Sequence, residues 1–161
     1  MTENYTKVQR GFRILHPILA GYIGQEMSRE YKDDWWQEVL RTLPEQARDL
    51  PEQGDYAELV DSLDIANCLR LFDRKWNELF RRKLSIDYRT WAKELMGVRN
   101  KLAHLGGQDF NEEDTWRALD TMARLCGAID DIAAEEIRKL LREVRYGTAA
   151  GSTTVTNFSA A

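Results

Sequence analysis

The sequence has few of the residues that build metal or disulfide sites. It contains two cysteines, Cys68 and Cys126, and two histidines, His16 and His104. Two cysteines are too few for a disulfide framework, and the spacing of these four residues fits no zinc-binding pattern. Glycine loops of the Walker and dinucleotide-binding types are also missing. We therefore expect no cofactor and no metal, and two unpaired cysteines favour a reducing, cytoplasmic setting.

Long apolar runs and a large excess of positive charge are absent too. No stretch is apolar over the length of a membrane span, and no signal peptide is visible, so we expect no membrane association. The 23 Lys and Arg residues against 27 Asp and Glu give a net charge of −4. This balance argues against a globally basic nucleic-acid-binding protein, although it leaves room for a local basic surface.

Scarcity of proline and of β-branched runs favours an all-α fold, since only three prolines interrupt a chain rich in helix formers. Apolar residues recur at steps of three and four, which is the helical period. A kink is expected at Pro17 in the first helix. Asn111 is a typical helix N-cap, and Asp114 three residues later resembles a capping box. The predicted helices span residues 5–31, 35–43, 64–83, 87–105, 112–126 and 130–145, with a loop over 44–54.

These helices predict one domain, an antiparallel helical bundle over residues 4–146. Residues 147–161 are small and polar, which is typical of a flexible tail or of the start of a linker to a further domain. Trp35 and Trp36 are adjacent in a predicted helix, so we expect one of them at an interface rather than in the core. Gly97 weakens its helix, which indicates a close approach by another helix, within the chain or across a dimer.

Positive charge is concentrated in one part of the chain. Between Arg70 and His104 there are ten basic and four acidic residues, so this segment carries +6 while the whole chain carries −4. Such asymmetry is typical of a phosphate-binding surface, but two solvated helix faces would produce it as well. The sequence leaves both interpretations open.

A short polar string, RNKLAH, closes the predicted helix 87–105 just before two glycines. Asn100 and His104 are four residues apart and share a face, about 40° from each other. Arg99 and His104 are five apart, about 140° around the axis and roughly 7.5 Å along it, so on a straight helix they do not converge. Either the last turn loosens at the glycine pair, or two copies of the chain contribute to one cleft across a two-fold axis.

A structural explanation of these residues stays open at this point. Arg99 could pair with Glu94 or Asp114, and His104 could bond a carbonyl at the helix end. His16 lies on an otherwise apolar helix, and nothing nearby in the sequence completes a site, so we expect a structural role for it.

Several segments together resemble the HEPN superfamily (higher eukaryotes and prokaryotes nucleotide-binding), and in particular its Swt-one type. They are the RNxxxH string within VRNKLAH and the segments GFRILHPIL, DDWW, WNELF and DTWRALDTMARL, which cover most of residues 8–145. The resemblance implies a two-fold dimer that cleaves RNA without a metal. Arg99 would hold the scissile phosphate, His104 would act as general base or acid, and Asn100 would orient either group. Under this interpretation the candidate RNA-binding residues are Arg82, Lys83, Lys93 and Lys101.

The same resemblance also implies an alternative. Many HEPN domains are non-catalytic dimerisation or recognition modules, often at the N-terminus of a larger ATPase, helicase or antiviral defence protein, and others act in toxin–antitoxin pairs. The sequence does not decide between a ribonuclease and such a module.

Overall fold

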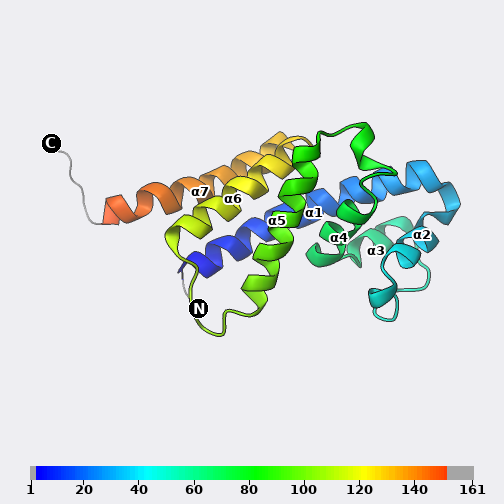
Figure 1. Ribbon diagram of the computed structural model, residues 1–161, viewed down its shortest axis with the longest axis horizontal. Coiled ribbons are helices and arrows are strands. Elements are labelled where there is room, and N and C mark those ends of the chain that lie inside the picture. The colour runs from blue at the N-terminus through cyan, green and yellow to red at the C-terminus, as the bar shows by residue number, and fades with distance from the viewer. Residues whose placement is uncertain (1–2, 152–161) are drawn as a thin grey trace.

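The computed structural model describes residues 3–151, and the regular elements in this range are helices (Figure 1). The longest helices are α1 (Glu3–Tyr31), α5 (Ile86–Ala103), α6 (Glu112–Gly127) and α7 (Asp131–Gly151). Shorter ones are η1 (Lys32–Asp34), α2 (Trp35–Thr42), η2 (Pro44–Gln46), α3 (Tyr56–Asp61), α4 (Ile65–Arg74) and η3 (Phe80–Arg82). The predicted all-α helical bundle is confirmed. No described helix combines the length and apolar character needed to cross a membrane.

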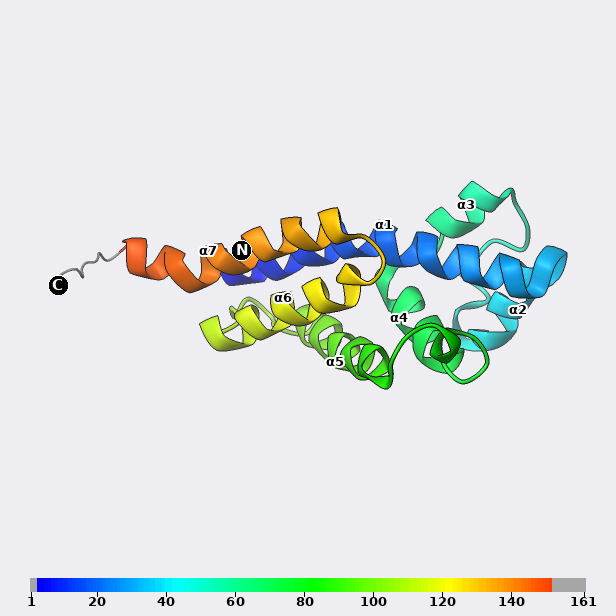
Figure 2. The same ribbon diagram turned by 90° about the horizontal axis from the view of Figure 1, so that it is seen from above.

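Helix α1 runs along the length of the molecule and packs against two groups of helices. Its N-terminal half packs against α6 and α7, which run antiparallel to each other, and its C-terminal half packs against α2, α3 and α4 (Figures 1 and 2). The helix continues through Pro17, and its fully buried face includes Leu15, Leu19 and Ile23. One contiguous apolar core therefore runs along the whole length of α1.

Helix α5 is peripheral and crosses the bundle while contacting α4 and α6 (Figure 2). Only Ala92 and Leu95 among its residues are fully buried. A stripe of exposed residues runs along its outer side at helical steps of three and four; it consists of Ile86, Thr90, Lys93, Gly97 and Asn100, and continues to His104. We call this set the α5 stripe.

The predicted helix over 64–83 is wrong in its second half, because α4 ends at Arg74. After the helix, the side chain of Lys75 is buried beside Glu38, Glu78 and the hydroxyl of Tyr31. The aromatic residues that follow reach the core through turns: Phe80 stacks on Phe72 with centroids 4.7 Å apart. Apolar spacing alone did not distinguish these turns from a continued helix.

The short helix α3 was not predicted from the sequence, although its start is well marked. Asp55 accepts a hydrogen bond from the backbone N–H of Glu58, and the Glu58 carboxylate accepts one from the N–H of Asp55. This reciprocal pair is a capping box. At α6, Asn111 caps the helix as predicted by accepting from the N–H of Asp114 at 2.7 Å.

The expectation that Trp35 and Trp36 could not both be inside is wrong, because they are 8% and 3% exposed. The loop after α2 and helix α3 cover the start of α2 from a second side. Trp36 donates its indole N–H to the carbonyl of Pro51 at 2.7 Å, and Trp35 packs on Tyr56 with centroids 5.5 Å apart. Two sides of one helix turn are thus buried.

Two further expectations are corrected by the backbone. A Cβ added at Gly97 would meet no atom within 4 Å, so no helix among the described residues packs closely there, while the alternative of an approach across a dimer stays a prediction. Helix α7 continues to Gly151 rather than ending near Arg145. The rest of the expected tail, residues 152–161, lies outside the described residues.

Candidate functional site

The RNxxxH string occupies the last turn of α5 and the residue after it. The helix ends at Ala103, and His104 is the C-cap residue, with φ −121° and its backbone N–H donated to the carbonyl of Lys101 at 3.0 Å. Gly106 and Gly107 have φ values of 59° and 96°, in the region that favours glycine. Both Asn100 and His104 are exposed. The helix end therefore presents an amide and an imidazole to solvent.

The loop after His104 is tied to the start of α1. The carboxylate of Asp109 accepts hydrogen bonds from the backbone N–H groups of Asn4 and Tyr5, at 3.3 and 2.7 Å. Asn4 in turn donates its side-chain amide to the carbonyl of Phe110 at 2.9 Å. The Phe110 ring is buried and lies 5.2 Å from the ammonium group of Lys101. These contacts fix the position of the chain on both sides of the glycine pair.

Arg99 points to a different side of α5 from the α5 stripe. It is half-buried at a cleft of about 390 Å³ between α1, the start of α4 and the last turn of α5. We call this the α1–α5 cleft. Its polar lining residues are Tyr5, Gln9, Arg13, His16, Asp64 and Arg99, and its apolar lining residues are Phe12, Ile65, Leu102 and Ala103.

His104 is not among the residues that line the α1–α5 cleft. One chain therefore does not bring Arg99 and His104 into the same cavity, in agreement with the 140° between them on a helix. His16 also lines the cleft. The structural role expected for it agrees with its hydrogen bond, in which Nε2 lies 2.6 Å from the carbonyl of Leu63 and donates to it, since a carbonyl can only accept.

The ion pairs considered for Arg99 do not form. Glu94 binds Arg117 at 3.1 Å and accepts from the hydroxyl of Thr121 at 2.8 Å, while Asp114 binds Lys101 at 3.0 Å. Within the part of the chain that the structure describes, no carboxylate or carbonyl bonds to the guanidinium of Arg99. An unpaired arginine in a cleft is available to a ligand anion.

Most of the basic segment is neutralised by acids from other helices. Lys75 shows this most clearly: burial opposes its charge, but hydrogen bonds to Glu38, Tyr31 and Glu78 raise the pKa of the ammonium group overall. Arg74 pairs with Glu45 at 3.0 Å, and the ring of Tyr31 lies 4.8 Å from the Lys75 ammonium. The net charge of +6 on the segment from Arg70 to His104 is thus largely neutralised by acidic side chains from other parts of the fold.

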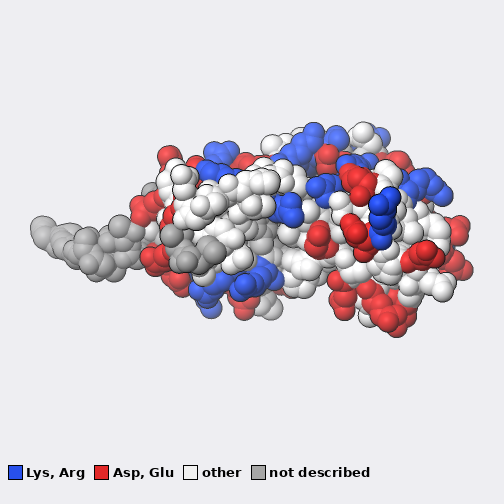
Figure 3. Space-filling view, turned by 90° about the horizontal axis from the view of Figure 1, so that it is seen from below, with Lys and Arg blue, Asp and Glu red and all other residues white. Residues whose placement is uncertain are grey.

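The four candidate RNA-binding residues are also in ion pairs. The pairs are Lys83 with Glu26 at 3.1 Å, Arg82 with Glu30 at 2.9 Å, Lys93 with Asp73 at 3.8 Å and Lys101 with Asp114 at 3.0 Å. Arg82 precedes the first residue of α5 and Lys101 lies in its last turn, so most of the length of this helix, on the order of 25 Å, separates them. Figure 3 shows basic and acidic side chains interspersed on one face, with acidic ones gathered at the end that carries α2 and α3.

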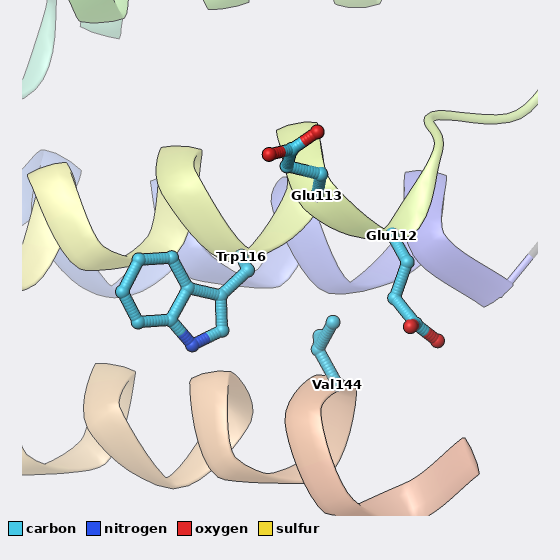
Figure 4. Close-up of a pocket in the computed structure, with 4 residues that line it drawn as sticks. All are labelled: Glu112, Glu113, Trp116 and Val144. Carbon is cyan, nitrogen blue, oxygen red and sulfur yellow. The ribbon is translucent and has the colours of Figure 1, made fainter.

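A second and larger cavity, of about 560 Å³, lies between the start of α6 and the end of α7. Trp116 and Val144 point into it, whereas Glu113 points toward the other side of α6 (Figure 4). The Glu112 carboxylate beside it would repel a phosphate, and none of its described lining residues is basic. The described residues also contain no group of three or more His, Cys, Asp or Glu side chains placed to hold a metal ion. The α1–α5 cleft is therefore the better candidate for a nucleotide.

Comparison with known protein families agrees with this arrangement. The family model described as Swt1-like HEPN matches residues 10–130, which is more than half of the chain and includes α5 with its RNxxxH string. No curated protein and no solved structure matches the chain. The resemblance seen in the sequence is confirmed: the chain belongs to the Swt1-like HEPN family, and this membership points to an RNase-type or nucleotide-binding module.

Proposed function

We propose that this chain is a metal-independent endoribonuclease domain whose site is shared by two copies. The observation that carries the proposal is the RNxxxH string at an exposed helix end, with Arg99 free of any acidic partner among the described residues and His104 open to solvent. A guanidinium holds a phosphate and stabilises the charge that grows on it in the transition state. An imidazole moves protons near neutral pH.

In the proposed reaction, His104 removes the proton from a ribose 2′-hydroxyl, and the 2′-oxygen attacks the adjacent phosphorus. The bond from phosphorus to the 5′-oxygen breaks, and that oxygen takes a proton from an imidazolium. The products are a 2′,3′-cyclic phosphate and a 5′-hydroxyl. Arg99 neutralises the phosphorane-like charge, and Asn100, on the same face as His104, orients the ring or the phosphate.

Two copies are invoked because one chain separates the two groups. Arg99 faces the α1–α5 cleft, while His104 ends the exposed α5 stripe. A two-fold contact along the last turn of α5 places both motifs beside one axis, since an isologous interface presents the same residues from each side. The open space beside Gly97 leaves room for a second copy.

Cleavage is tested with purified protein and single-stranded RNA in EDTA. Arg99→Ala and His104→Ala should each abolish cyclic-phosphate product, whereas Arg81→Ala, which removes an exposed arginine outside the motif, should cleave like the parent. Cleavage that persists in both motif variants, or that is absent from the parent protein, would sink the catalytic proposal.

The shared site is tested by cross-linking. Both native cysteines are fully buried, so Asn100→Cys introduces the one reactive thiol expected within the described residues. A short bis-maleimide should join two Asn100→Cys chains, and the control Gln37→Cys, on the exposed side of α2, should stay uncoupled. Equal coupling in both variants would argue against a contact at α5.

A second candidate function is a non-catalytic dimerisation or recognition module at the N-terminus of a larger ATPase, helicase or defence protein. The observation that favours it is the neutralised surface: Arg82, Lys83, Lys93 and Lys101 all have acidic partners. This module would cross-link through Asn100→Cys but leave RNA intact in the EDTA assay. The two experiments together therefore separate the candidates.

A further inference from the structure

The α1–α5 cleft holds a second arginine that the motif does not include. Arg13 lines it from α1 and Arg99 lines it from α5. Neither guanidinium has an ion pair or hydrogen bond within the described part of the chain, while most other arginines there are paired with carboxylates. The carboxylate of Asp64 also lines the cleft, where it caps α4 by accepting from the backbone N–H of Asn67, so two guanidinium groups against one carboxylate leave a net positive charge. Two guanidinium groups on one cleft attract an anion with more than one charge, and phosphodiesters on successive nucleotides are such an anion.

The rest of the cleft suits the uncharged part of a nucleotide. Phe12, Ile65 and Leu102 supply an apolar wall, and the half-buried ring of Tyr5 lies at the same cleft. Gln9 contributes an amide that can both donate to and accept from a base edge. A volume of about 390 Å³ falls in the range of roughly 300–1,000 Å³ that is typical of small-molecule sites.

The position of the cleft relates it to the motif. Arg99, Leu102 and Ala103 line it, and Ala103 immediately precedes His104. A chain whose scissile phosphate lies on Arg99 can therefore continue from the helix end into the cleft toward α1. The N-terminal turn of α1 is fixed there by Asp109, so the walls of the cleft are held together by the loop that follows the motif.

We propose that the α1–α5 cleft binds the nucleotide next to the scissile phosphate. Arg13 binds the neighbouring phosphate, and the base lies against the apolar wall, with its edge toward Gln9. This inference rests on the proposed ribonuclease function for its orientation, but the binding itself does not require cleavage. The residues involved on α1 lie outside the RNxxxH string and extend the site across the bundle.

The test uses a probe that cannot be cleaved: fluorescein-labelled RNA decamers with 2′-O-methyl groups, measured by anisotropy at several salt concentrations. Arg13→Gln should weaken binding by about tenfold to one-hundredfold, as expected for loss of a charge-assisted contact. The plot of log affinity against log salt concentration, whose slope is negative, should also become less steep by about 0.7. Arg10→Gln is the matched control, since Arg10 is an exposed arginine on the same helix that does not line the cleft.

The outcomes separate this inference from the ribonuclease proposal. If Arg13→Gln and Arg10→Gln bind the probe equally, the cleft is not the nucleotide site, whatever the cleavage assay shows. If Arg13→Gln alone loses affinity and the parent protein does not cut RNA, the cleft is confirmed and the ribonuclease proposal fails. Gln9→Leu provides a second measure and should change the preference among the four homopolymeric probes. Arg13 is exposed, so a thermal melt like that of the parent is expected and excludes misfolding as the cause.

Discussion

Replacing Gly97 with alanine should stabilise the folded chain. Gly97 lies inside α5, where glycine is less favourable than alanine by about 1 kcal/mol. The added Cβ would meet no atom within 4 Å, so no steric cost offsets this gain. For a domain of this size, 1 kcal/mol corresponds to a rise in Tm of roughly 2–4 °C.

The measurement is urea unfolding of dilute protein, followed by circular dichroism. Gly21→Ala is the matched control, because Gly21 is also inside a helix and its Cβ would likewise meet nothing within 4 Å. The two variants should gain similar free energies of unfolding. A loss of stability in Gly97→Ala beside a gain in Gly21→Ala would show that the space beside α5 is filled in the monomer, and the structural reasoning would be refuted.

The larger change Gly97→Leu separates folding from association. Leucine is a good helix former, and its side chain would extend into open space in a single chain. A second copy packed on the α5 stripe would collide with it. We expect a folded protein that stays monomeric in light scattering and has lost RNA cleavage, while Gly21→Leu keeps both properties. An active dimer of Gly97→Leu would place the interface elsewhere.

Three further predictions follow from contacts away from the α5 stripe. Asp109→Ala should cost about 1 kcal/mol of unfolding free energy, because the first turn of α1 loses its cap; equal urea midpoints for variant and parent would contradict this. Cys68 and Cys126 should resist iodoacetamide at pH 8 and react after denaturation, because both are buried and burial raises the pKa of both thiols, to about 11 for Cys126. Mass spectrometry of the native protein should find neither cysteine alkylated. Burial opposes ionisation of Glu94, but hydrogen bonds from Arg117 and Thr121 lower the pKa of its carboxyl group overall. The ionised group therefore stabilises the fold above the ordinary glutamate pKa, and this stabilisation is lost as pH falls through the lowered value. Glu94→Gln should lose less unfolding free energy than the parent between pH 5 and pH 3 in urea melts.

Much of the fold follows from local signals in the sequence. The spacing of apolar residues predicted α1, α5 and α6 closely, because each buries one face against a neighbour over several turns. The same signal failed after Arg74, where Trp76 is buried from a turn and Phe80 from the short 3-10 helix η3 rather than from a continued α-helix. Burial at a helical interval is a necessary feature of an amphipathic helix, but consecutive turns over a core produce it too.

The motif could be found from the sequence, but the cleft beside it could not. Arg99 and His104 belong to one contiguous string, whereas Arg13 and Gln9 reach the same cleft from a helix more than eighty residues earlier. Only the crossing of α5 over α1 brings them together. The sequence also did not predict that the basic segment is neutralised, because its acidic partners, such as Glu26 and Glu45, come from distant parts of the chain.

The length of helix α1 also sets the distance and the rotation between the two ends of the molecule. The first half of α1 carries Arg13 and donates backbone N–H groups to Asp109 of the loop before α6, and the second half carries Glu26 and the contacts to α2, α3 and α4. Inserting one residue between the halves would turn one against the other by about 100° and shift it by about 1.5 Å. The cleft and the far core could then not both keep their partners. The helix should therefore tolerate substitutions on its exposed side far better than any change in its length.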